Sequence, residues 1–414
     1  YYKDKKDNYL DVTGCGNTIA ANRPIVRQLI LESMKCWANE LGVDGFRFDL
    51  GVALSRGEDL KPLDNPPLFE EIESDPELSD LKLISEPWDC GGLYKLKDFP
   101  AKRFNTWNGK FRDDLRCFWK GDKHTVWKLK ERLRGSKDLY PIKNNKYPIN
   151  FITSHDGFTL YDLVSFNKKH NLANGEKNFD GENHNNSWNH GIEGPTSLDK
   201  IKSLRERQQR NFLSSLLLTP GAPMILMGDE VGRSQGGNNN TWCQKTNLGR
   251  MIWNKDICNN NLLYFLRKLI LIRKIIPEVF CLNEISDESA ASNINGVINN
   301  QNLFIQWHGI NLNKPDWSDW SHTISYSVNK QSGSALIWVG LNAYSKCMTF
   351  ELPKATSNWE LLIDTSISES LCNKKLLKTQ SIASQKSIEL QDRSFLLLIS
   401  GEYATRIKKD DQNH

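Results

Sequence analysis

Hydrophobic positions in the first two thirds of the chain follow two alternating patterns. Pro24 opens a helical pattern that Gly42 is placed to close, and similar patterns cover residues 67–80, 200–217 and 261–277. Short apolar runs typical of buried strands lie between and around them, at residues 43–49, 81–89, 147–157 and 222–230. Apolar strands that alternate with helices predict parallel βα units with both sheet faces covered.

The pattern changes after about residue 282, where helical periodicity stops. Short strand-like runs separated by turn-forming residues follow, and the aromatic, polar stretch from residue 300 to 320 predicts a long hairpin. We therefore expect two domains, an α/β domain over 1–281 and an all-β sandwich over 282–414. The final residues, 406–414, are rich in charge and are expected to form a short solvated tail.

Three of the predicted strands end in carboxylates, namely Asp49, Glu86 and Asp156. Ligands bind at the C-terminal ends of parallel strands both in TIM-type barrels and in Rossmann-type sheets. No GxGxxG follows a strand and no GxxxxGK[ST] is present, which argues against nucleotide binding. Because side chains alternate along a strand, Arg47 and Asp49 point to the same side.

Paired carboxylates at strand ends suit glycoside hydrolysis, in which one carboxyl group donates a proton and another attacks the anomeric carbon. Each residue alone also has an ordinary explanation. Arg47 and Asp49 could form a structural ion pair, Glu86 could cap a helix, and His155 and Asp156 could belong to a simple turn. A metal site at His155 and Asp156 lacks close ligand spacing. The combination favours a catalytic site.

Two long polar segments, 166–191 and 232–244, follow the third and fourth of these strands. Loops of this length in a compact domain are usually functional or disordered. His170, Trp188 and His190 supply ring faces and hydrogen-bonding groups suited to a sugar, so we favour a functional role over two disordered insertions.

Composition excludes several classes of protein. The 414 residues carry 54 basic and 50 acidic side chains, a net charge of +4, which is too balanced to indicate a nucleic-acid or membrane partner. Nine scattered cysteines with no CxxC pair indicate free thiols in a reducing compartment. No apolar run of membrane-spanning length and no signal peptide is visible. Because the chain starts at Tyr1, we expect a fragment or a processed product.

Three motifs resemble conserved blocks of the α-amylase superfamily, glycoside hydrolase family 13: DGFRFDLG (44–51), ISEPWDCGG (84–92) and NFITSHDGFTLYD (150–162). The segments at 11–24, 166–191 and 228–244 resemble the isoamylase and glycogen-debranching branch. The resemblance implies Asp49 as nucleophile, Glu86 as general acid/base and Asp156 as transition-state stabiliser. It implies substrate-binding roles for Arg47 and His155, and Trp88 beside Glu86 is a further candidate.

The resemblance implies hydrolysis of α-1,6 branch linkages in glycogen or starch-like glucan, with retention of configuration, no cofactor and a cytoplasmic or plastid location. The expected fold is α/β, a partial (β/α)8 TIM-type barrel (about the second half) followed by an all-β sandwich C-terminal domain. The family's first conserved block has no counterpart here, the countable strands cannot close a barrel, and Lys245 replaces an expected aspartate. We therefore expect the N-terminal part to be missing, and residues 1–414 alone to aggregate and show little activity.

Two other functions remain open from the sequence. One is a non-catalytic glucan-binding or regulatory isoamylase-like subunit, and the other is a different family-13 activity on α-1,4 glucan. The retained carboxylates argue against the first alternative, and the long loop segments argue against the second.

Overall fold

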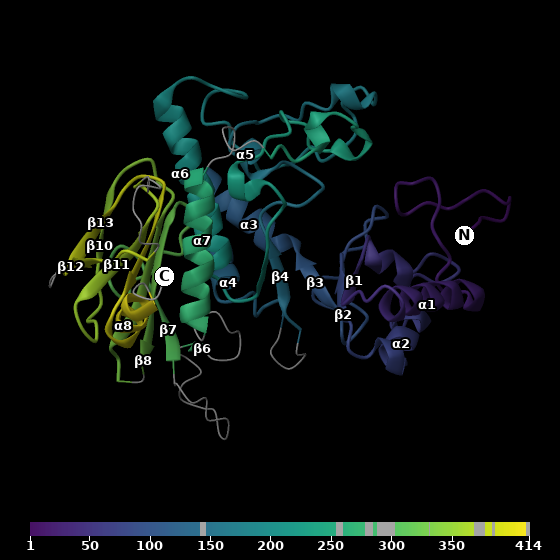
Figure 1. Ribbon diagram of the computed structural model, residues 1–414, viewed down its shortest axis with the longest axis horizontal. Coiled ribbons are helices and arrows are strands. Elements are labelled where there is room, and N and C mark those ends of the chain that lie inside the picture. The colour runs from purple at the N-terminus through teal and green to yellow at the C-terminus, as the bar shows by residue number, and fades with distance from the viewer. Residues whose placement is uncertain are drawn as a thin grey trace. The chain divides into compact units, whose positions relative to one another are not determined.

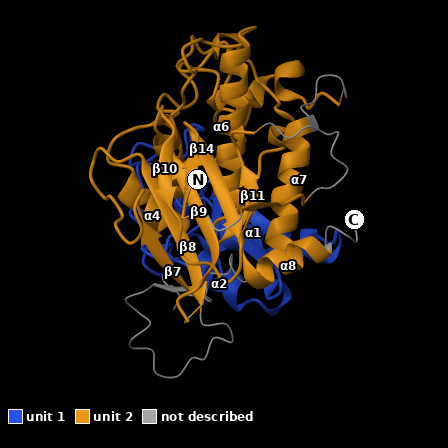
Figure 2. Ribbon diagram, turned by 90° about the vertical axis from the view of Figure 1, so that its left-hand side faces the viewer, with its two compact units in different colours: residues 1–108, 136–150 blue, residues 109–135, 151–414 orange. Residues whose placement is uncertain are grey.

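The computed structural model describes residues 1–140, 146–253, 260–277, 285–287, 303–330, 332–367, 377–382 and 386–410. The chain divides into two compact units, shown in blue and orange in Figure 2. Unit 1 comprises residues 1–108 and 136–150, and unit 2 comprises residues 109–135 and 151–414. The predicted domain boundary at 281/282 lies outside the described residues.

Unit 1 is built on a parallel sheet whose spatial order β1-β2-β3-β4 follows the chain (Figure 1). The strands are β1(Gly45–Phe48), β2(Lys82–Ser85), β3(Asn105–Asn108) and β4(Pro148–Phe151), whose last residue belongs to unit 2. The parallel pairing of β1 with β2, β2 with β3 and β3 with β4 confirms the predicted α/β architecture. β3 was not among the strands that the sequence predicted.

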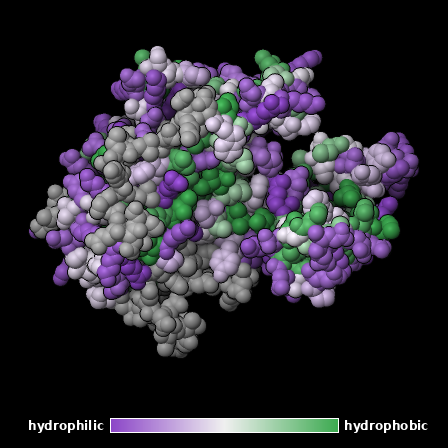
Figure 3. All heavy atoms as spheres, in the orientation of Figure 1, coloured by the Kyte–Doolittle hydropathy of each residue, from purple (hydrophilic) through white to green (hydrophobic). Residues whose placement is uncertain are grey.

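Helix α1(Pro24–Asn39) begins and ends where the sequence predicts. Gly42 adopts a φ of 69°, which favours glycine, and its N–H closes the C-terminal turn by donating to the carbonyl of Ala38 at 3.2 Å. One side of α1 packs Met34 into an apolar cluster with helix α2(Pro67–Ser74). The other side carries exposed apolar side chains, which include Ile25, Leu29 and Trp37. Green, hydrophobic patches are visible on the molecular surface in Figure 3.

Unit 2 combines helices with a large sheet. The helices are α3(Gly109–Lys120), α4(Val126–Leu133), α5(Leu160–Leu163), α6(Asp199–Leu217), α7(Asn260–Ile275) and α8(Gly401–Asp410), and the short strand β5(Ala222–Met224) follows α6. Figure 1 shows α6 and α7 side by side. One apolar cluster runs from these two helices, α3 and α4 into one face of the C-terminal sheet, so that face is covered by helices.

The C-terminal part confirms the predicted β domain. A seven-stranded sheet has the order β12-β11-β14-β9-β8-β7-β6, and β10 and β13 pair separately. The bounds are β6(Ile285–Asp287), β7(Leu303–His308), β8(Thr323–Lys330), β9(Ala335–Asn342), β10(Met348–Glu351), β11(Trp359–Asp364), β12(Gln380–Ile382), β13(Ser387–Leu390) and β14(Ser394–Ile399). β7 and β8 form an antiparallel hairpin; the stretch 300–320, for which a hairpin was predicted, contains its first strand and the connection, and the second strand lies beyond it. A second apolar cluster, which includes Trp338 and Phe350, joins the two sheets as a sandwich core.

The prediction of a solvated tail from residue 406 is wrong for residues 406–410. Helix α8 continues through Asp410, and its Tyr403 and Ile407 are fully buried. The spacing of these two apolar side chains places them on one face of the helix, and this burial outweighs the charge of the neighbouring lysines. Lys408 pairs with Glu360 of β11 at 2.7 Å, so part of the charge is also used inside the fold.

Candidate active site

Arg47 and Asp49 project from the C-terminal end of β1 in unit 1. The Arg47 guanidinium lies 3.0 Å from a carboxylate oxygen of Asp49, so the two side chains share one side of the strand as the alternation predicts. The Asp49 side chain is 73% exposed, whereas that of Arg47 is 28% exposed. Asp49 is therefore open to a ligand while its arginine partner is partly enclosed.

Glu86 reaches the same edge because β1 and β2 are parallel and Phe48 is in register with Ser85. The carboxylate is almost completely buried. It accepts a hydrogen bond from the Leu50 N–H at 2.8 Å and forms an ion pair with Arg47. Oxygen atoms of Asp49 and Glu86 lie within 4.8 Å of each other. Arg47 thus contacts both carboxylates, a shared contact that the sequence alone did not predict.

Aromatic rings surround this arginine and carboxylate group. The Arg47 guanidinium lies over the Trp107 ring at 4.4 Å, within the range of a cation–π interaction. Trp88 stacks on Tyr94 with ring centroids 6.1 Å apart, and its centroid is 6.4 Å from that of Trp107. Sequence reasoning selected Trp88 and missed Trp107. Trp107 lies near the end of β3, and recognising that strand would have drawn attention to it.

His155 and Asp156 lie in the turn after β4, in unit 2. Their side chains approach to 3.4 Å and are 51% and 71% exposed. Gly157 follows with a φ of 120°, and its N–H donates to the carbonyl of Asn239 at 2.9 Å. The turn therefore presents two polar side chains to solvent while its backbone is held from segment 232–244.

Two buried carboxyl groups, Asp229 and Asp162, form hydrogen bonds next to this turn and to segment 232–244. Asp229 accepts a hydrogen bond from the Leu160 N–H at 2.8 Å and another from the Thr153 hydroxyl. Burial raises the pKa of Asp229 to about 7. Asp162 accepts from the Gln235 N–H at 2.7 Å, and burial raises its pKa as well. Asp229 thus links Thr153, before the turn, to Leu160, after it, whereas Asp162 holds segment 232–244.

The segments 166–191 and 232–244 are held together by buried amides rather than forming two disordered insertions. Asn171 donates to Asn239 Oδ1 at 2.8 Å and accepts from the Asn239 N–H at 3.0 Å. The same Asn171 amide donates to the carbonyl of Asp180 at 2.9 Å. Because Asn239 also holds Gly157, this amide pair links both segments to the turn.

The three rings selected in segment 166–191 have different surroundings. His170 Nε2 lies 3.0 Å from a carboxylate oxygen of Glu193. Trp188 and His190 have ring centroids 4.0 Å apart, and the Arg393 guanidinium lies 4.3 Å from the Trp188 ring. Trp188 and His190 therefore form one ring pair, His170 contacts Glu193, and a sugar-binding role for these rings stays a prediction.

Within its own unit, each candidate residue lies at the end of a parallel strand. Arg47, Asp49, Glu86 and Trp88 belong to unit 1, whereas His155 and Asp156 belong to unit 2. Unit 1 thus brings two carboxylates, a shared arginine and aromatic rings together at one edge of the sheet. The catalytic roles assigned to these residues stay predictions.

Comparisons with known proteins identify relatives of this chain. The family described as "Isoamylase 1-3, C-terminal" matches residues 306–400. Isoamylase 1, chloroplastic, of Arabidopsis thaliana is 40% identical over 389 residues, which cover 88% of this chain and 48% of the relative. The rice enzyme of the same name is 39% identical and covers 88% and 46%. The glycogen operon protein GlgX homolog of Mycobacterium tuberculosis is 48% identical over 270 residues, covering 64% and 37%.

The fold likeness extends to solved structures. Type I pullulanase from Bacillus subtilis, in complex with maltose, superposes with a TM-score of 0.65 at 20% identity, covering 96% of this chain and 49% of the pullulanase. This likeness shows a shared fold. The sequence relatives, at 39% to 48% identity, show that the chain belongs to the isoamylase and GlgX debranching family of glycoside hydrolase family 13. It spans about half the length of the curated relatives it matches.

Proposed function

We propose that this protein acts as a retaining glycoside hydrolase on α-1,6 branch linkages of glycogen or a starch-like α-glucan. The observation that carries the proposal is the approach of Asp49 and Glu86 to within 4.8 Å at the ends of adjacent parallel strands. Retaining glycosidases place their two carboxyl groups about 5 Å apart so that one can attack the sugar directly. The family relationship supports the choice of linkage.

In the proposed reaction, exposed Asp49 attacks the anomeric carbon while Glu86 protonates the departing glycosidic oxygen. A covalent glycosyl intermediate forms, and Glu86 then takes a proton from the water that hydrolyses it. Asp156 is proposed to stabilise the positive charge of the transition state, and His155 and Trp88 are proposed to contact sugar.

Arg47 has a specific task in this scheme. In the structure it pairs with Glu86 as well as with Asp49. A guanidinium at Glu86 favours the ionised carboxylate, whereas the first step needs the protonated acid. We therefore infer that Arg47 moves from Glu86 towards Asp49 when the substrate occupies the site, which favours the ionised nucleophile and frees Glu86 to hold a proton.

The test is release of reducing ends from amylopectin by the 414-residue chain and by any longer natural form that contains it. Asp49→Asn should lower the rate at least about 1,000-fold, because the amide is nearly isosteric but cannot act as a nucleophile. Asp44→Asn is the matched control, since exposed Asp44 precedes β1, opposite the end at Asp49, and loses the same charge.

The outcomes separate the alternatives. An Asp49→Asn variant that keeps activity within a few-fold of wild type would exclude Asp49 as the nucleophile. Amylopectin binding without release of reducing ends in any form would favour the non-catalytic subunit. Short linear products with intact branch points would favour cleavage of α-1,4 linkages.

The proposed location is the cytoplasm, or the plastid in a photosynthetic eukaryote. Several plant relatives are named as chloroplastic. The cysteines within the described residues are free thiols, which suits a reducing compartment. No helix among the described residues is long and apolar enough to cross a membrane.

A further inference from the structure

The loop at residues 87–95, which follows β2 in unit 1, folds back on itself. The Asp89 N–H donates to the carbonyl of Leu93 at 3.0 Å. Trp88 and Tyr94 face each other as an antiparallel bridge, and their rings stack with an angle of 14° between the ring planes. The loop therefore carries Trp88, a candidate sugar contact, on a hairpin-like support.

One buried ion pair fixes the base of this loop. The Asp89 side chain is fully buried, and one of its carboxylate oxygens lies 2.8 Å from Arg56 Nε and 2.7 Å from Arg56 Nη2. The other oxygen accepts a hydrogen bond from the Leu93 N–H at 3.0 Å. Both oxygens are thus satisfied by the protein, and a pair this buried is costly to break because water cannot replace either partner.

Arg56 is itself fixed by the segment that follows β1. It comes directly after the short helix η1(Gly51–Ser55), and its Nη1 donates to the carbonyl of Leu60. The Tyr2 hydroxyl donates to the carbonyl of Arg56 at 2.5 Å. The ion pair therefore ties the loop after β2 to the segment after β1, which begins at Asp49.

The groups around this ion pair are closely packed. A methyl group at Gly91 would lie 3.0 Å from Arg56 Nη2 and 2.9 Å from the Val12 side chain, so the loop rests directly on both. The Cys90 N–H donates to the carbonyl of Val12 at 2.9 Å. These contacts hold the loop from its buried side and leave Trp88 partly exposed.

Glu86 is held independently of this ion pair. Its carboxylate contacts the Arg47 guanidinium and the Leu50 N–H. Loss of the Arg56–Asp89 pair should therefore disturb Trp88 much more than the proposed acid.

We propose that Arg56 and Asp89 are positioning residues, which hold the loop at 87–95 so that Trp88 faces a sugar ring of the bound glucan. Neither can touch the glucan itself, because the Asp89 side chain is fully buried and that of Arg56 is 9% exposed. A ring that is already fixed loses little conformational freedom on binding, so the ion pair should raise the affinity for glucan. The inference rests on the proposed function, in which Trp88 contacts sugar.

The kinetic test uses amylopectin and any form of the chain that releases reducing ends. In Asp89→Asn, KM should rise at least about 10-fold and kcat should change less than about 3-fold, because Trp88 contributes binding that is equal in the ground and transition states. Arg56→Lys keeps the charge but not the two-pronged contact, so KM should rise by only about 3-fold. Asp114→Asn, which breaks a buried pair with Arg132 in unit 2, is the matched control and should leave KM unchanged.

Fluorine NMR tests the positioning without requiring activity. The chain is labelled with fluorotryptophan, and Trp88→Phe identifies the Trp88 resonance. Maltoheptaose should shift this resonance in the wild-type chain. In Asp89→Asn the resonance should be displaced or broadened before sugar is added, and half of the shift should require at least about 10-fold more maltoheptaose.

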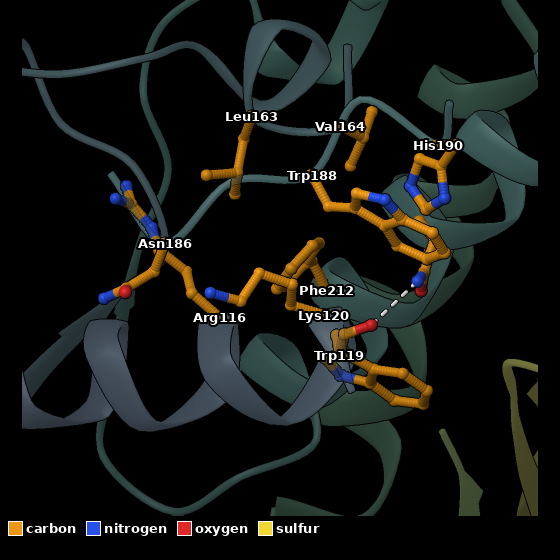
Figure 4. A pocket seen from close by; sticks show the side chains of 10 residues that line it. Arg116, Trp119, Lys120, Leu163, Val164, Asn186, Trp188, His190 and Phe212 are labelled. Atoms are coloured by element: carbon orange, nitrogen blue, oxygen red, sulfur yellow. Dashed lines mark hydrogen bonds between the residues drawn. The ribbon is translucent and has the colours of Figure 1, made fainter. Parts of the chain in front are cut away.

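Trp188 of unit 2 is the internal control in the same spectra. Figure 4 shows it beside His190, with ring centroids 4.0 Å apart, and the Arg393 guanidinium lies 4.3 Å from its ring. These contacts come from unit 2 alone. Asp89→Asn should therefore leave the Trp188 resonance, which Trp188→Phe identifies, in its wild-type position.

Two results would overturn the inference. One is a Trp88 resonance that does not respond to millimolar maltoheptaose in the wild-type chain. The other is an unchanged Trp88 resonance and sugar response in Asp89→Asn, or in Arg56→Lys should Asp89→Asn not fold, since the ion pair would then serve stability alone. Failure of the proposed hydrolysis looks different: no form releases reducing ends, yet Trp88 still responds to maltoheptaose and Asp89→Asn still weakens that response, which would support the inference.

Discussion

Glu86 and Asp156 both follow parallel strands, yet the protein positions them by different means. Glu86, in unit 1, is 3% exposed and is held by the Arg47 guanidinium and the Leu50 N–H. The Asp156 side chain, in unit 2, is 71% exposed and sits on a turn whose neighbour Gly157 is held by Asn239. A buried carboxylate needs a compensating charge, whereas an exposed one needs only a defined backbone.

The largest expected effect comes from removing the charge that compensates Glu86. Arg47→Ala should lower the free energy of unfolding by about 3–5 kcal/mol, because it leaves a buried carboxylate without its cation. Adding Glu86→Gln should recover part of this loss. Urea denaturation measures both. Arg23→Ala, which breaks the exposed pair with Glu58, should leave the midpoint unchanged. Equal midpoints for Arg47→Ala and Arg23→Ala would contradict this account.

In unit 2, the free energy of unfolding should depend on pH through Asp229, which bonds to both sides of the turn. Since burial raises the pKa of Asp229 from 3.8 to about 7, the folded state binds its proton more tightly than the unfolded state. Its contribution is complete below about pH 4 and is lost as pH rises towards 7, amounting to up to about 4 kcal/mol. Asp229→Asn should flatten that slope in denaturation experiments from pH 4 to 7.

Asp199→Asn serves as the control for this slope, because Asp199 lies in the first turn of α6 with a side chain that is 95% exposed. It should keep the wild-type dependence on pH. A slope that is as steep in Asp229→Asn as in Asp199→Asn would mean that Asp229 is ionised in the folded protein at pH 4.

A smaller effect is expected where an amide, not a charge, does the positioning. Asn171→Ala removes hydrogen bonds to Asn239 and Asp180 and should cost about 1–3 kcal/mol. The Gly157 N–H should then exchange with solvent faster, by about tenfold or more. Hydrogen exchange measured by NMR tests this. Asn8→Ala, which removes an exposed bond to Asp4, should leave Gly157 unaffected.

The smallest effect on stability is expected at Asp156 itself. Asp156→Asn should change the free energy of unfolding by less than about 1 kcal/mol, because its pair with His155 is exposed to solvent. Glu86→Gln should cost clearly more, since it leaves Arg47 facing a neutral amide. Similar losses in the two variants, measured by urea denaturation, would remove the distinction between the two positions.

Much of the secondary structure could be predicted from local pattern. Helix α1 runs from Pro24 to Asn39 because proline suits the first turn and Gly42 suits the end. The first strand of the β7 and β8 hairpin likewise lies in the stretch from residue 300 to 320, where the sequence predicted a hairpin. Strand β3 was missed because three of its four residues, NTWN, are polar, so it carries no apolar run. Helix α8 was missed because its charged residues outnumber the few apolar ones that it buries.

The candidate site likewise contains one contact that local pattern predicted and several that it did not. Alternation along one strand was enough to place Arg47 beside Asp49. The contact of Arg47 with Glu86 depends on the register between β1 and β2, which no local pattern specifies. The cation–π contact with Trp107 depends on β3 in turn. The buried Asn171–Asn239 pair joins residues 68 positions apart, in two segments without periodicity.

The sequence by itself therefore determined the α/β and β parts, the family and the strand-end carboxylates, because period and motif are local properties of the chain. Only the tertiary structure decided which carboxylate is buried and which arginine compensates it. Burial and electrostatic compensation depend on distances between residues that are far apart in sequence, so they exist only once the strands pair and the helices pack.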